Sequence, residues 1–103
     1  MDWVKAAIAA TDGKQLTLGE MGALLQISGR TLARKLEEEG TTYRDVVQAC
    51  RHERAIVLLC HSAMTVSEIA HKLGYGDASN FGRAFRQAAG MTPGQYRALH
   101  ATH

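Results

Sequence analysis

The chain has 103 residues, of which 46% are hydrophobic, with a single proline and a formal net charge of +2. This length fits one domain with a modest core, and the composition suits a compact helical protein, but so small a charge does not by itself indicate a nucleic-acid binder. Without a signal-peptide pattern or an apolar run of about 18 residues, we expect a cytoplasmic protein that is neither exported nor membrane-spanning.

The first predicted helix is Asp2–Ala10. Its apolar residues recur at helical spacing, which places four of them on one face: Trp3, Val4, Ala7 and Ile8. We expect this face to pack as a lid on the segment that follows. A turn is expected over residues 11–14.

Residues 16–41 are predicted to form two short helices joined by a tight turn. Thr17 caps the first helix, over residues 18–25, and Ser28 caps the second, Gly29–Glu38. The inward positions of the second helix are Leu32 and Leu36. Its outward positions are Arg30, Thr31, Ala33 and Arg34. An apolar rear and a polar-basic front are typical of a helix-turn-helix motif.

A long central helix is expected over about residues 42–60. Its apolar residues form two buried stripes: Tyr43, Val46, Val47, Cys50, Ala55, Leu58 and Leu59. Such a helix can pack against the segments on both sides and fix their separation. Cys50 and Cys60 lie about 15 Å apart along its axis, too far for a disulfide, so we expect both to be reduced and buried. We expect Arg51 and Arg54 to form structural ion pairs.

Residues 64–99 repeat the two-helix arrangement. Thr65 caps the first helix, and Glu68 can reach back to complete a capping box. Gly74 ends that helix, and Asp77 caps the next. The apolar positions of the two helices are Val66, Ile69, Ala70, Leu73, Phe81, Ala84, Phe85 and Ala88. The outward positions of the second helix are Ala78, Ser79, Asn80, Arg83 and Arg86.

The two segments match in more than apolar spacing. The offset between matched residues grows from 48 to 50 along the motif. The matched pairs are Thr17 with Thr65, Glu20 with Glu68, Leu32 with Phe81, Arg34 with Arg83, and Gly40 with Gly90. Chance similarity between two helical hairpins would reproduce the apolar spacing but seldom the caps, the arginine and the closing glycine together. The chain therefore contains two helix-turn-helix motifs.

Two such motifs joined by a long helix, the second ending in GYGDASNFGRAFRQAAGMTPGQYR, resemble the DNA-binding domain of AraC/XylS-type transcription regulators. The resemblance covers residues 16–97 and implies an all-α fold of about seven helices, with the second helix of each motif in a major groove. Two residues depart from the family pattern. Gly22 stands where alanine is usual, which we expect to weaken its helix by about 0.5–1 kcal/mol. Gly29 opens a helix where a helix former or proline is usual.

The outward faces of the second helices are the candidate DNA-reading surfaces. Arginine can bond guanine through two parallel hydrogen bonds, asparagine can do the same with adenine, and threonine can touch a thymine methyl. The candidates for base contacts are Arg30, Thr31, Arg34, Ala78, Ser79, Asn80 and Arg83, with Ala33 added by the resemblance. The candidates for phosphate contacts are Thr17, Lys35, Thr65 and Arg86, which would position the protein without specifying sequence.

We expect sequence-specific binding of double-stranded operator DNA, with both reading helices in adjacent major grooves and the duplex bent toward the protein. RNA polymerase is the second expected partner. The run LARKLEEEGTTYRDVVQACRHERAIVLL looks closer to family members that carry an N-terminal effector-binding or dimerisation domain. We therefore expect the excised C-terminal domain of a longer effector-responsive regulator, monomeric alone and able to dimerise through the missing domain.

Two alternatives come from other function classes. The same surfaces could bind a protein partner and not DNA, which the modest net charge permits. An enzyme could use the cysteines and histidines of the central helix, Cys50, His52, Cys60 and His61. Their spacing matches neither a zinc site nor a nucleophile motif, so we expect no enzyme, no metal and no cofactor.

Overall fold

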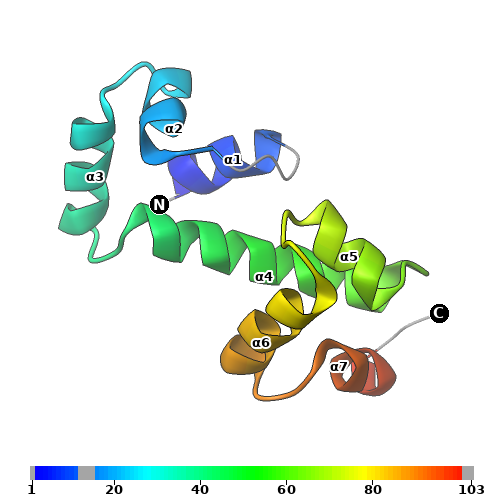
Figure 1. Ribbon diagram of the computed structural model, residues 1–103. Coiled ribbons are helices and arrows are strands. Elements are labelled where there is room, and N and C mark those ends of the chain that lie inside the picture. Colours follow the sequence, from blue (N-terminus) through cyan, green and yellow to red (C-terminus); the bar gives the residue numbers. More distant parts are fainter. Residues whose placement is uncertain (1, 12–15, 101–103) are drawn as a thin grey trace. The chain divides into compact units, whose positions relative to one another are not determined.

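A computed structural model describes residues 2–11 and 16–100 (Figure 1). These residues form seven helices and no strand: α1 (Asp2–Ala10), α2 (Leu18–Leu24), α3 (Gly29–Glu38), α4 (Tyr43–His61), α5 (Val66–Lys72), α6 (Ala78–Ala89) and α7 (Pro93–His100). The predicted all-α fold is confirmed. In this part of the chain, no helix has the length and apolar character needed to cross a membrane.

The chain divides into two compact units, an N-terminal unit of Met1–Cys50 and a C-terminal unit of Arg51–His103. The boundary falls inside α4, the predicted central helix. Each unit holds one helix-turn-helix motif and its own hydrophobic core. The predicted turn over residues 11–14 lies, beyond Thr11, outside the described residues.

The core of the N-terminal unit collects side chains from α1 to α4: Val4, Met21, Leu32, Leu36, Val46 and Cys50. Val4 is fully buried, with Ala7 and Ile8 packed beside it, so α1 covers this core as expected. Trp3, in contrast, is 39% exposed, and its predicted place on the inward face is wrong. Adjacent helical positions point about 100° apart, so Trp3 lies at the edge of the stripe formed by Val4, Ala7 and Ile8, and it stays partly exposed there.

The helix starts are capped as the sequence predicts. The hydroxyls of Thr17 and Thr65 accept from the backbone N–H of Glu20 and Glu68, and both glutamates complete a capping box. Ser28 and Asp77 cap α3 and α6, the second helices of the two motifs and the candidate recognition helices. These caps satisfy backbone N–H groups that a helix start leaves without intrahelical partners. They therefore fix where α2, α3, α5 and α6 begin.

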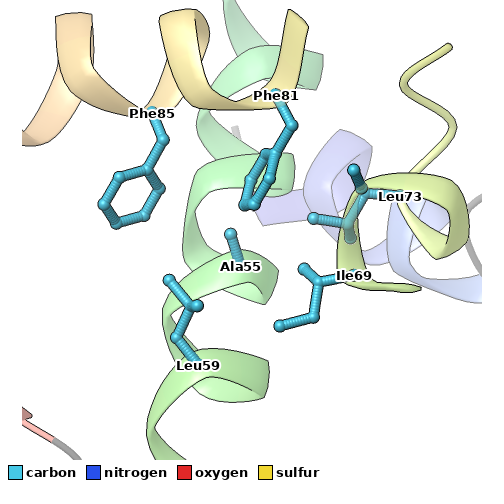
Figure 2. Packing of buried hydrophobic residues seen from close by; sticks show 7 residues of the cluster. Ala55, Leu59, Ile69, Leu73, Phe81 and Phe85 are labelled. Carbon is cyan, nitrogen blue, oxygen red and sulfur yellow. The ribbon is translucent and has the colours of Figure 1, made fainter. Parts of the chain in front are cut away.

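The core of the C-terminal unit is built around two aromatic rings. Figure 2 shows Phe81 and Phe85 of α6 meeting side chains of α4 and α5, namely Ala55, Leu59, Ile69 and Leu73. The predicted inward position of Ala88 is wrong, because Ala88 is exposed while Ala89 packs on this core. The reason is that α7 covers this side of α6, with the Tyr96 ring 5.4 Å from the ring of Phe85.

Two arginines of the C-terminal unit have structural roles. Arg97 donates from Nε to the Leu59 carbonyl at 3.0 Å and from Nη2 to the Leu58 and Ser62 carbonyls, both at 3.3 Å. Its guanidinium thereby caps the C-terminal end of α4. The guanidinium of Arg51 lies 5.0 Å from the centre of the Tyr75 ring. Within the described residues, the structural contact of Arg51 is thus a cation–π contact and not the expected ion pair.

Glycines bring α2 close to the turn and to α3. A Cβ on Gly22 would lie 2.8 Å from the Ile27 carbonyl oxygen and 3.0 Å from the Gly29 nitrogen. A Cβ on Gly29 would lie 3.3 Å from the Cα of Gly19. Because these neighbours are backbone atoms, an alanine at Gly22 would require the backbone of the turn between α2 and α3 to shift. That Gly22 weakens its helix stays a prediction; the structure adds that the missing Cβ allows this close packing.

Candidate nucleic-acid interface

The two recognition helices are held by the same arrangement of core residues. The buried face of α3 carries Leu32 and Leu36, and the buried face of α6 carries Phe81 and Phe85. A helical residue midway between two such positions points about 160° away from each of them, toward the opposite face. Arg34 and Arg83 occupy those midway positions, and both are exposed.

On α3, the predicted base-reading residues gather around one surface hollow of about 340 Å³. The hollow is lined by Arg30, Thr31, Ala33, Arg34 and Glu37. Arg30 and Arg34 are exposed, whereas Thr31 and Ala33 are half-buried. All four candidates from α3 therefore share one face. Glu37 was not predicted for this face, although it follows Ala33 by one helical turn, a spacing that brings side chains together.

The hydroxyl of Thr31 is engaged with the helix cap. Ser28 donates its hydroxyl proton to Thr31 Oγ1 at 2.9 Å, and the backbone N–H of Thr31 donates to Ser28 Oγ at 3.0 Å. The γ-methyl group is the other feature that Thr31 can offer. A methyl group can pack against the methyl group of thymine but cannot form a hydrogen bond to a base edge.

On α6, two candidate base readers contact each other. Ser79, Asn80 and Arg83 are exposed and Ala78 is half-buried. The backbone N–H of Asn80 donates to Asp77 Oδ1 at 2.8 Å, and Asn80 Oδ1 accepts a hydrogen bond from Arg83 Nη2. The sequence carried a signal for this pair, since residues three apart are neighbours on a helix surface.

Two of the candidate phosphate contacts are side chains, and the other two are backbone N–H groups that already donate hydrogen bonds within the protein. Lys35 and Arg86 are exposed cations. The backbone N–H groups of Thr17 and Thr65 instead donate to capping-box carboxylates, at 3.0 Å to Glu20 and at 2.8 Å to Glu68. A phosphate at either helix start would have to compete with a carboxylate.

The carboxyl of Glu68 is stabilised in its ionised form. The hydrogen bond from the Thr65 backbone N–H, followed by one with the Thr65 side chain, holds the pKa of Glu68 below its usual value. The effect is local to the start of α5, because the carboxylate is fully exposed. Among the described residues, no three His, Cys, Asp or Glu side chains are grouped so that they could hold a metal ion.

The sequence matches a family model described as a helix-turn-helix domain over residues 21–99. It is 38% identical to the ornithine utilization regulator of Pseudomonas aeruginosa, over 91% of this chain and 28% of that protein. It is 41% identical to the HTH-type transcriptional regulator VqsM of the same species, over 71% of this chain and 22% of that protein. The chain thus spans about a quarter of the length of these curated relatives.

Solved structures share the fold. A DNA-binding transcriptional dual regulator from Escherichia coli K-12 superposes with a TM-score of 0.90 at 31% identity, covering 94% of this chain and 87% of that one. The DNA-binding domain of the global transcriptional factor AdpA, solved with a target DNA, superposes with a TM-score of 0.83 at 25% identity. That match covers 95% of this chain and 89% of the AdpA chain.

Proposed function

Because the chain belongs to the AraC-type helix-turn-helix family of transcription regulators, we propose that it binds double-stranded operator DNA sequence-specifically through α3 and α6. The observation that carries this proposal is the repeated presentation of an exposed arginine. Arg34 and Arg83 each lie between two buried core residues of their helix, so both motifs display a cation on the face opposite their core. A protein that acts on chromosomal DNA in this way would work in the cytoplasm.

Each recognition helix would enter a major groove and read base edges. Arg30, Arg34 and Arg83 suit guanine, and the methyl groups of Thr31, Ala33 and Ala78 suit thymine. Ser79 is a further proposed base contact, and Asn80 lies on the same face, hydrogen-bonded to Arg83. Lys35 and Arg86 would bind phosphates and set the register of the helices on the duplex. Thr17 and Thr65 would contribute least, since carboxylates already occupy their backbone N–H groups.

The two motifs would read one face of the duplex in successive major grooves, about 34 Å apart. If the protein holds its reading helices closer than one turn of straight DNA, the duplex has to bend, at a cost of roughly 1–6 kcal/mol. Good contacts from both motifs would offset that cost. We therefore expect an asymmetric, bent site, which circular-permutation gel shifts would detect.

Selection of binding sites from random duplexes, followed by fluorescence anisotropy on the enriched sequence, tests the proposal. We expect Arg34→Ala and Arg83→Ala each to weaken binding by about 10-fold or more, because a good bidentate arginine–guanine pair discriminates by about 1–3 kcal/mol. Arg44→Ala is the matched control, since Arg44 is an exposed arginine of α4 outside both reading faces. No enriched sequence, or equal affinity in all four proteins, would point to the alternative of a protein-binding surface.

The longer curated relatives suggest how the domain is used. We propose that it acts as the C-terminal, DNA-binding part of an effector-responsive regulator that dimerises through another domain and contacts RNA polymerase. The mass of the native gene product and transcription in vitro from a promoter that carries the enriched site would test both points.

A further inference from the structure

The contact between Asn80 and Arg83 bears on how the second motif reads DNA. We propose that Asn80 is a positioning residue that clamps Arg83 onto guanine and does not itself read adenine. This inference rests on the proposed DNA binding and names the base that the C-terminal unit should select. It also separates two side chains that the sequence places together as base readers.

Both the backbone and the side chain of Asn80 form hydrogen bonds. Its backbone N–H donates to Asp77 Oδ1 at 2.8 Å, which fixes it in the first turn of α6. Its side-chain oxygen accepts from Arg83 Nη2. A Cβ on Gly76 would lie 3.7 Å from Asn80 Nδ2, so the amide nitrogen is directed back toward the turn before α6. The orientation of the carboxamide follows from chemistry, since arginine can only donate and only the amide oxygen can accept.

This orientation disfavours adenine reading. A bidentate contact with adenine uses the asparagine oxygen as acceptor and the asparagine nitrogen as donor at the same base edge. In this structure the oxygen is directed to Arg83 and the nitrogen toward Gly76. Reading adenine would require Asn80 to turn away from both neighbours.

The same orientation favours guanine reading by Arg83. A guanidinium has five N–H donors, and the bond to Asn80 takes one of them. The remaining donors can serve the O6 and N7 acceptors of guanine. Because Asn80 already restricts the long side chain of Arg83, less conformational freedom is left to lose when DNA binds.

The first motif is built differently at the matching position. Thr31 precedes Arg34 by the same three positions, but its hydroxyl accepts from Ser28 at 2.9 Å. Arg34 instead shares its hollow with Arg30 and Glu37. We therefore expect the second motif to be the stricter of the two toward its guanine.

A double-mutant cycle on the enriched duplex tests the proposal, with wild type, Asn80→Ala, Arg83→Ala and the double variant. We expect Asn80→Ala to weaken binding by about 3- to 10-fold, and the double variant to bind like Arg83→Ala alone within about 2-fold, because the two residues act as one unit. Circular dichroism of each variant checks that the fold is kept.

Base preference gives the second readout. Asn80→Ala should relax selection at the guanine that depends on Arg83 and leave every adenine position unchanged. Asn80→Asp keeps an acceptor for Arg83 but has no N–H for adenine N7. It should therefore retain the guanine preference even if its added charge lowers affinity for all sequences.

The failures can be told apart. If wild type enriches no sequence, the proposed function fails and this inference falls with it. If wild type selects a site but the losses of Asn80→Ala and Arg83→Ala add, or if Asn80→Ala relaxes an adenine position, only the clamp is overturned. The clamp is also overturned if Arg83→Ala leaves selection unchanged.

Discussion

The carbonyl oxygen of Ile27 would lie 2.8 Å from a Cβ placed on Gly22, inside the contact distance of the two atoms. The Ile27 backbone N–H also donates to the Gly22 carbonyl at 2.8 Å. In the second motif, Tyr75 donates to the Ala70 carbonyl at 3.0 Å. The turn hydrogen bond is thus repeated in both motifs. In the first motif the residue that accepts it is Gly22, which allows the Ile27 carbonyl to come close, whereas in the second motif the matching residue is Ala70.

Gly22→Ala is expected to destabilise the N-terminal unit by about 1–3 kcal/mol, because the added methyl would press on backbone atoms that cannot turn aside. Gly82→Ala is the matched control. A Cβ there meets nothing within 4 Å, so the same change inside α6 should stabilise by about 0.5–1 kcal/mol. Urea denaturation of both variants measures these effects. A neutral or stabilised Gly22→Ala would contradict the close approach.

Gln26→Gly is expected to stabilise the N-terminal unit by up to about 1 kcal/mol. Gln26 has a φ of 63°, in the left-handed region, where a side chain is strained and glycine is not. Gly74, at the matching position of the second motif, has a φ of 87°. The reverse change, Gly74→Gln, should destabilise by about 1–2 kcal/mol. Thermal unfolding followed by circular dichroism would show the opposite signs, and equal signs would refute the explanation.

Arg97→Ala is expected to destabilise the C-terminal unit by about 1–3 kcal/mol, since the carbonyls of Leu58, Leu59 and Ser62 would lose a charged donor. Arg97→Lys should recover only part of this, because an ammonium lacks the fork that reaches several carbonyls at once. Hydrogen exchange at the end of α4 measures the loss directly. Equal stability of all three proteins would mean that water satisfies these carbonyls just as well.

The start of α5 should weaken in acid. Because the folded pKa of Glu68 lies below its unfolded value, its contribution is fully present above about pH 4.5 and is lost as the pH falls through the folded pKa. NMR titration of the carboxyl should show the lowered pKa, with a partial return toward the ordinary value in Thr65→Ala. The return is partial because the backbone N–H of Thr65, the larger cause, remains. An unchanged pKa in that variant would exclude a role for the hydroxyl.

Affinity for DNA should fall steeply with salt, because phosphate contacts release counterions. Lys35→Ala and Arg86→Ala should each reduce the slope of log K against log [salt] by about 1 and weaken all sequences alike. Arg34→Ala should instead change which sequences are preferred. Binding to the enriched duplex and to a scrambled duplex at several salt concentrations separates the two behaviours.

The fold was predictable where local chemistry determines it. The caps at Thr17, Ser28, Thr65 and Asp77 are where the sequence indicates, because a hydroxyl or carboxylate oxygen and the N–H it accepts lie within one turn of chain. The bounds of α3 follow from its cap and match the structure. The two buried pairs, Leu32 with Leu36 and Phe81 with Phe85, were also predicted, because their spacing is local to one helix.

The errors arose where a distant element decides. Trp3 and Ala88 fit an inward stripe by spacing alone, but which edge of the stripe is covered depends on the neighbouring helices. The importance of Gly22 depends on the approach of the turn at Ile27, which no pattern in the sequence reports. The pairing of Asn80 with Arg83 is the exception, because the two residues lie one helical turn apart and their spacing already indicated a contact.

Helix α4 runs through the boundary between the two units, since it spans Tyr43–His61 and the boundary follows Cys50. Severing the chain there would expose up to about four carbonyls on one side and four N–H groups on the other, all deprived of helical partners. The two motifs share one continuous helix, α4. A fragment that carries either motif alone is therefore expected to fold stably only if the new end of α4 is redesigned with capping residues.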